Sequence, residues 1–195
     1  MSEDKPLLFL DVDGVLNGAT SSYQEHLVEV PRGEMPRSPF VTPSSAEVVT
    51  FNLRLDNSLD ALLAELGAYY ELVWATTWEH LANRHVGPLL GLGELATVAF
   101  SAEPATDLEV FHSQVSAWKW RSLMRYADGR AFAFVDDDAH ELGGLYPPGR
   151  GLWPVVVAPE YILSQSEVAV LVSEAKSTPL DALDPKASST RTYKS

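Results

Sequence analysis

Two groups of aspartates follow apolar segments of the chain and could carry out chemistry on phosphate. They are Asp11 and Asp13 near the N-terminus, and Asp136, Asp137 and Asp138 in the second half. Carboxylates that gather at one place repel one another and raise each other's pKa unless a divalent cation neutralises them. Mg²⁺ suits such a site, because it prefers oxygen ligands and keeps water beside a few carboxylates and a substrate phosphate. The chain has no cysteine, which excludes thiolate zinc sites and thiol nucleophiles.

The segment Asp11-Val12-Asp13-Gly14-Val15 divides the chemistry between its two carboxylates. A carboxylate is a competent nucleophile for phosphoryl transfer when a metal screens its charge, so Asp11 would attack phosphorus. Asp13 would protonate the leaving oxygen and later deprotonate the water that cleaves the acyl-phosphate. Gly14 would let the chain turn sharply after the strand. Alone, such a segment is more often a simple turn, but its position after a buried strand favours a catalytic role.

Thr76, Thr77 and Lys119 could bind the phosphate. Thr76 lies at a strand end just before an expected helix, where its hydroxyl and the first helical amides attract an anion, and Thr77 could serve instead. Either threonine could also simply cap the helix. Lys119 is the only lysine between Lys5 and Lys176, so it would supply the ammonium group, although it could also be a surface residue of an amphipathic helix.

The elements that would position these residues are buried parallel strands. Four apolar segments read as strands covered on both faces: residues 7–10, 72–75, 132–135 and 155–157. Ligands of open α/β sheets bind beyond the carboxyl ends of the strands, so Asp11, Thr76 and Asp136 should converge on one crevice.

Helical patterns alternate with these strands. Asn57 or Ser58 could cap a helix of period 3.6 that ends near Gly67, and further helices are expected after Thr77, from about 108 to 126 and from about 166 to 175. This alternation predicts an α/β fold with a mostly parallel central sheet, arranged as a Rossmannoid three-layer sandwich.

Two segments depart from this alternation. Residues 17–55 hold four prolines and should form a flap or minimal cap, in which 49–55 and 27–30 pair as antiparallel strands. The segment 177–195 is polar and reads as a frayed tail. We therefore expect one hydrolase domain over residues 1–176, followed by that tail.

The net charge of −13 opposes a broad nucleic-acid or membrane surface, because such binding relies on Lys and Arg contacts to phosphates. A phosphorylated small molecule remains possible as a substrate, as does a nucleic-acid end that reaches a local basic spot, for which Arg32 and Arg37 are the candidate in the otherwise acidic first half. No apolar segment approaches the length of a membrane helix, and no signal peptide is evident, so a cytoplasmic location is expected.

These motifs resemble those of the haloacid dehalogenase (HAD) superfamily and occur in the same order. They are Leu7–Val15, Leu72–Thr76, Lys119 and Phe132–Asp137.

The resemblance implies a phosphatase with Asp11 as nucleophile, Asp13 as acid/base, and Thr76 and Lys119 as phosphate ligands. It also implies that Mg²⁺ is held by Asp11, the main-chain carbonyl of Asp13, and Asp136, with Asp137 in support; Asp138 stays an alternative to Asp137. The segments Leu10–Asn17 and Val73–Trp78 are similar to compact HAD domains that occur alone or in RNA-repair proteins.

Two other functions remain open. A phosphoacceptor receiver domain of a signalling pathway also combines aspartates, a threonine, a lysine and Mg²⁺ on a doubly wound sheet. Its phosphorylated aspartate, however, lies between the acidic pair and the threonine, whereas here an aspartate pair opens the chain. A HAD-like binding protein that has lost turnover is the second alternative, although every expected reactive group is present.

Overall fold

A five-stranded parallel sheet forms the centre of the molecule. The computed structural model describes residues 5–18, 20–34, 47–100, 119–140, 142 and 154–177. From edge to edge the sheet strands are β5 (Ala96–Thr97), β4 (Glu71–Trp74), β1 (Leu7–Leu10), β6 (Phe132–Val135) and β7 (Val155–Val157). Every neighbouring pair is parallel, which confirms the four strands expected from the sequence. The two-residue strand β5 was not predicted, because it is too short to show a periodic pattern.

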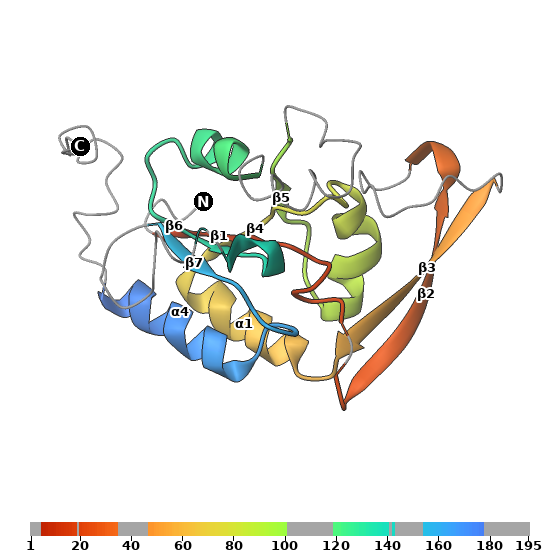
Figure 1. Ribbon diagram of the computed structural model, residues 1–195, viewed down its shortest axis with the longest axis horizontal. Coiled ribbons are helices and arrows are strands. Elements are labelled where there is room, and N and C mark those ends of the chain that lie inside the picture. Colours follow the sequence, from red (N-terminus) through yellow and green to blue (C-terminus); the bar gives the residue numbers. More distant parts are fainter. Residues whose placement is uncertain are drawn as a thin grey trace.

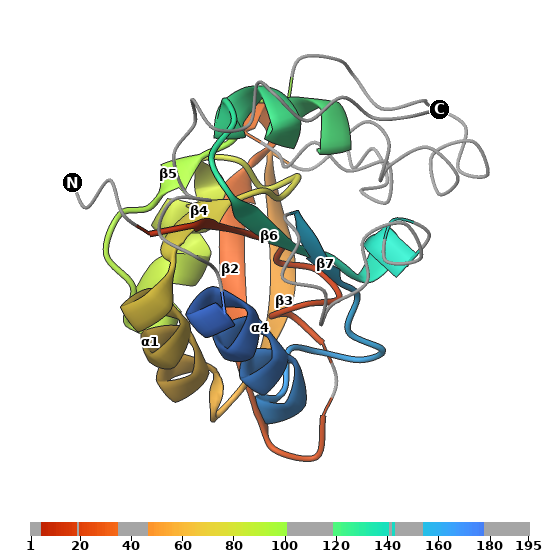
Figure 2. The same cartoon turned by 90° about the vertical axis from the view of Figure 1, so that its left-hand side faces the viewer.

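Helices cover both faces of this sheet and make the predicted three-layer sandwich (Figures 1 and 2). Alternate residues of β1 point to opposite faces. Leu8 and Leu10 pack in one apolar cluster with α1 (Leu59–Tyr69) and α4 (Gln165–Ser177). Leu7 and Phe9 pack in a second cluster with Leu123, on the helix at residues 119–127. Because both faces are buried, the strands are apolar throughout.

The observed helices match the expected ones, with small differences. α4 confirms the helix expected at 166–175, and residues 108–118 of the third helix lie outside the described residues. α1 begins after Ser58, as one of the two suggested caps, and continues past Gly67 to Tyr69. The predicted end at Gly67 is therefore wrong. The helix ends at Tyr69, and the next residue, Tyr70, is buried and bonds the main chain of α4, which holds the chain where it leaves the helix.

The chain after Thr77 forms a turn before it becomes helical. The π-helix η2 (Ala82–Val86) follows, and the 3₁₀ helix η3 (Gly87–Leu90) continues from it. The predicted helix therefore begins later than expected and is not a regular α-helix. Within η2, the side chain of Asn83 bonds both the indole of Trp74 and the main chain of Leu95, which ties this helix to β4 and to the segment before β5.

The expected flap contains a two-stranded antiparallel hairpin, which stands at one end of the domain in Figure 1. β2 (Tyr23–Pro31) pairs along its whole length with β3 (Val48–Asp56), so the predicted pairing is confirmed. The 3₁₀ helix η1 (Arg32–Glu34) follows β2, and residues 35–46, which include Arg37, lie outside the described residues. Val28, Val30 and Leu53 are buried, so one face of the hairpin joins the core.

Within the part of the chain that the structure describes, no helix combines the length and the apolar character needed to cross a membrane. The segment expected to form a polar tail lies outside the described residues from 178 onward, and α4 extends to Ser177. The division into a domain and a tail therefore stays a prediction.

Candidate active site

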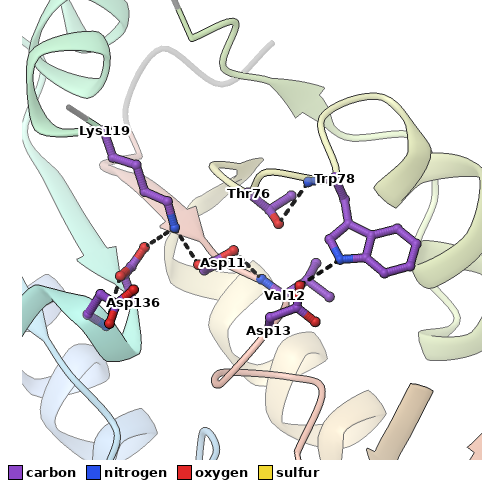
Figure 3. Close-up of polar contacts among 8 residues, drawn as sticks. Asp11, Val12, Asp13, Thr76, Trp78, Lys119 and Asp136 are labelled. Atoms are coloured by element: carbon purple, nitrogen blue, oxygen red, sulfur yellow. Dashed lines mark hydrogen bonds and ion pairs between the residues drawn. The ribbon is translucent and has the colours of Figure 1, made fainter. Parts of the chain in front are cut away.

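The carboxyl ends of the two central strands bring the two groups of aspartates together. β1 and β6 are neighbours in register, with Leu10 opposite Val135. The N–H of Asp11 donates to the carbonyl of Val135 at 3.1 Å, and the N–H of Asp136 donates to the carbonyl of Val157 at 3.2 Å. Asp11 and Asp136 thus follow adjacent strands with their main chains held by the sheet (Figure 3).

Lys119 bridges these two aspartates. Its Nζ lies 2.5 Å from Oδ2 of Asp11 and 2.5 Å from Oδ2 of Asp136. Lys119 is 2% exposed, which rules out the alternative that it is a surface residue of an amphipathic helix. Burial alone would lower the pKa of Lys119, but the charges of Asp11 and Asp136 outweigh burial and raise it, so the side chain stays an ammonium.

Asp136 and Asp137 both have raised pKa values. Burial is the main cause for Asp136, the charge of Asp11 adds to it, and Lys119 opposes it. Desolvation also raises the pKa of Asp137 to about 6, and the charges of Asp11 and Asp138 act in the same direction. These carboxylates thus carry more negative charge than the ammonium of Lys119 compensates.

The donor set fits a hard divalent cation. One carboxylate oxygen from each of Asp11, Asp136 and Asp137 lies within 4.8 Å of the others. Among the described residues, these three carboxylates face one ammonium, that of Lys119, so a cation would relieve the remaining repulsion, and an all-oxygen set is what Mg²⁺ prefers. Of the two open candidates, Asp137 belongs to this group. The main-chain N–H of Asp138 instead donates to Oδ1 of Asp136 at 3.0 Å, where the 3₁₀ helix η4 (Asp137–Ala139) begins.

Gly14 is required by two features of this site. Its φ is +72°, a conformation that costs most side chains energy, and it turns the chain after β1 as predicted. A Cβ at this position would also lie 2.0 Å from Oδ2 of Asp137. The sequence predicted the turn but not this close approach, which arises only when the β1 and β6 loops meet.

The carboxylate of Asp13 is held by two side chains. Nδ2 of Asn17 donates to Oδ1 at 2.8 Å, and Nε1 of Trp78 donates to Oδ2 at 2.9 Å. Desolvation raises the pKa of Asp13 and the charge of Asp11 adds to this, while the hydrogen bonds from Asn17 and Trp78 oppose it. With its carboxylate so engaged, Asp13 could reach a metal through its main-chain oxygen, as the resemblance implies.

Sequence reasoning assigned neither Asn17 nor Trp78 to the site. Trp78 is 2% exposed, as a residue that only packs in the core would also be. Its position two residues after Thr76 was the only available signal. Asn17 lies in the segment that resembles compact HAD domains, but nothing in the surrounding sequence indicated a role for its side chain.

Thr76 lies across Asp11 from Lys119 in Figure 3. It is fully buried, and its hydroxyl oxygen accepts a bond from the N–H of Trp78 at 3.3 Å, which leaves its own proton to donate. Thr77 is only half-buried. The phosphate-binding roles of Thr76 and Lys119 stay predictions, and the structure places both residues beside Asp11.

A family model described as "HAD domain in Swiss Army Knife RNA repair proteins" matches residues 7–168. The matched range includes every sheet strand, the hairpin and all the predicted site residues. The comparison with curated proteins and the comparison with solved structures gave no match.

Proposed function

Because the chain belongs to the family of HAD domains found in Swiss Army Knife RNA repair proteins, we propose that it is a Mg²⁺-dependent phosphate monoester hydrolase. The observation that carries this proposal is the position of Asp11. It lies at the end of the central strand and contacts one buried ammonium, and its carboxylate is grouped with those of Asp136 and Asp137. The HAD superfamily consists of phosphotransferases and hydrolases. In this arrangement one carboxylate can attack phosphorus, while the ammonium and a cation held by the carboxylates would offset the negative charge of the phosphate and of the attacking group.

In the proposed reaction Asp11 is the nucleophile. The N–H of Val12 donates to its Oδ1 at 2.7 Å and Lys119 holds its Oδ2, so the carboxylate has a set orientation. One carboxylate oxygen forms a bond to phosphorus as the bond to the ester oxygen breaks, and Asp13 gives its proton to that oxygen. Asp13 then takes a proton from the water that attacks phosphorus. The bond between phosphorus and Asp11 breaks, which releases inorganic phosphate.

The residues that would hold Mg²⁺ are Asp11, the main-chain carbonyl of Asp13, and Asp136, with Asp137 in support. When bound, the cation would offset the repulsion between the carboxylates and the incoming phosphate. Lys119 and Thr76 would bind the phosphate oxygens, with Lys119 turning part of its donor capacity from the aspartates to the substrate.

The proposed substrate is a phosphorylated small molecule or a nucleic-acid end, met in the cytoplasm. The net charge of −13 disfavours a substrate gripped along a long polyanionic surface. A substrate whose single terminal phosphate enters the site is compatible with that charge.

The test is phosphate release from a panel of monoesters, including 3′- and 5′-phosphorylated oligonucleotides, with Mg²⁺ or with EDTA. We expect release only with Mg²⁺, and a loss of about a thousandfold or more in Asp11→Asn, because that amide is not a nucleophile. Unchanged release in Asp11→Asn would refute the mechanism. Saturable Mg²⁺-dependent binding of a monoester without turnover would instead favour the silent binding protein.

A further inference from the structure

Two side chains orient the carboxylate of Asp13 from different parts of the chain. Asn17 lies four residues further along the same loop, whereas Trp78 comes from the segment after β4. Each donates to a different oxygen, so the plane of the carboxylate is set by two N–H groups (Figure 3 draws the bond from Trp78). An acid/base must point at the oxygen whose proton it transfers, and this orientation is the property that the two bonds supply.

The same two residues also contact the hairpin. Oδ1 of Asn17 accepts from the main-chain N–H of Arg54 in β3 at 2.8 Å. The Trp78 ring meets the ring of Phe51, also in β3, edge-on with centroids 5.0 Å apart. The position of the hairpin is therefore linked to the orientation of Asp13 through a hydrogen bond and through an aromatic contact.

We propose that Trp78 is a positioning residue, whose indole N–H aims the carboxylate of Asp13 at the leaving oxygen while its ring ties that carboxylate to the hairpin. This inference rests on the proposed function. Trp78 suits the role because an indole only donates, so it cannot compete with Asp13 for the transferred proton. Its burial and its contact with Phe51 restrict the ring to one orientation.

The test compares two esters in Trp78→Phe. p-Nitrophenyl phosphate has a leaving group that departs without a proton, whereas methyl phosphate needs one. The ratio kcat/KM covers the steps up to formation of the phosphoenzyme, so it isolates the step in which Asp13 acts as an acid. We expect kcat/KM to fall about tenfold or more for methyl phosphate and less than about threefold for p-nitrophenyl phosphate.

Trp74→Phe is the matched control. Trp74 is also buried, and its Nε1 donates to Oδ1 of Asn83 at 2.8 Å, so the same substitution removes an indole N–H that does not touch Asp13. In Trp74→Phe, the ratio of kcat/KM for methyl phosphate to kcat/KM for p-nitrophenyl phosphate should stay as in the wild type. Asn17→Asp should reproduce the selective loss, because it replaces the donor to Asp13 with a repelling carboxylate.

An equal loss on both esters in Trp78→Phe, or no loss on either, would overturn the inference. A wild-type protein that hydrolyses neither these two esters nor any monoester of the panel, oligonucleotides included, would overturn the proposed function instead. The contact can then be tested by NMR, with the indole N–H signal of Trp78 identified as the one missing in Trp78→Phe. That signal should shift in Asp13→Ala, and an unshifted signal would contradict the contact itself.

Discussion

At the scale of single residues, the site depends on a few atoms in close contact. Lys119 neutralises part of the charge of Asp11 and Asp136, and it does so from a buried position. Lys119 therefore compensates charge whether or not a phosphate is present. Gly14 contributes by having no side chain, because a Cβ at this position would overlap the carboxylate of Asp137.

Gly14→Ala should lower both stability and Mg²⁺ affinity. The left-handed backbone at Gly14 costs an alanine about 1–2 kcal/mol, and the new Cβ must also displace Asp137. Isothermal titration with Mg²⁺ and urea denaturation measure the two effects. Gly91→Ala is the matched control, since Gly91 has a φ of +66° with no atom within 4 Å of the added Cβ. Gly91→Ala should lose only the backbone contribution of about 1–2 kcal/mol and keep its Mg²⁺ affinity; equal affinity losses in both variants would contradict the proposed role of the contact.

At the scale of elements, the two helices on one face of the sheet are joined by a buried hydrogen bond. The hydroxyl of Tyr70, just after α1, donates to the carbonyl of Leu171 in α4 at 2.6 Å. At the other end of the domain, Arg84 of η2 forms an ion pair with Glu34 of η1, which adds a polar contact between the hairpin and the segment after β4. This ion pair is solvent-exposed, so we assign it little stability.

Tyr70→Phe should lower the free energy of unfolding by about 0.5–1.5 kcal/mol, because a buried hydrogen bond to the carbonyl of Leu171 is lost. Urea denaturation measures this change. Tyr69→Phe is a suitable control: Tyr69 is only partly buried, and its ring would still lie under Nζ of Lys176. A larger loss in Tyr69→Phe than in Tyr70→Phe would contradict the assignment.

At the scale of the whole molecule, the acidic site should make stability depend on pH and on Mg²⁺. The pKa of Asp137 is raised to about 6 in the folded protein, above its ordinary value of 3.8. Between these values the folded state holds more protons than the unfolded state, so without a divalent cation this group's contribution to stability is lost as pH rises. Bound Mg²⁺ should restore stability above that range, because it binds only the folded arrangement of carboxylates.

Thermal unfolding in EDTA at about pH 4.5 and about pH 7.5 tests this expectation for the wild type and Asp137→Asn. Relative to the wild type, the variant should gain in Tm as the pH rises. With Mg²⁺ added at the higher pH, the wild type should gain more Tm than the variant. If the difference in Tm between the wild type and Asp137→Asn, measured in EDTA, is the same at both pH values, then Asp137 does not cause the pH dependence.

The local pattern of the chain determined the strands and most of the site. A strand buried on both faces must be apolar, so Leu7–Leu10 and Phe132–Val135 could be predicted from the sequence. Because parallel strands end at the same edge of the sheet, the aspartates that follow them were expected to lie together. The antiparallel hairpin could also be predicted, because apolar and polar residues alternate along β3, and the apolar ones are partly or fully buried.

Only the tertiary structure decided which long-range contacts complete the site. The bond from Trp78 to Asp13 spans 65 residues, and the one from Lys119 to Asp11 spans 108. Such contacts depend on how loops from separate strands approach one another, and the local periodicity of the sequence does not determine that approach. The steric need for Gly14 beside Asp137 and the choice of Asp137 over Asp138 in the carboxylate group have the same origin, since both follow from the meeting of the β1 and β6 loops.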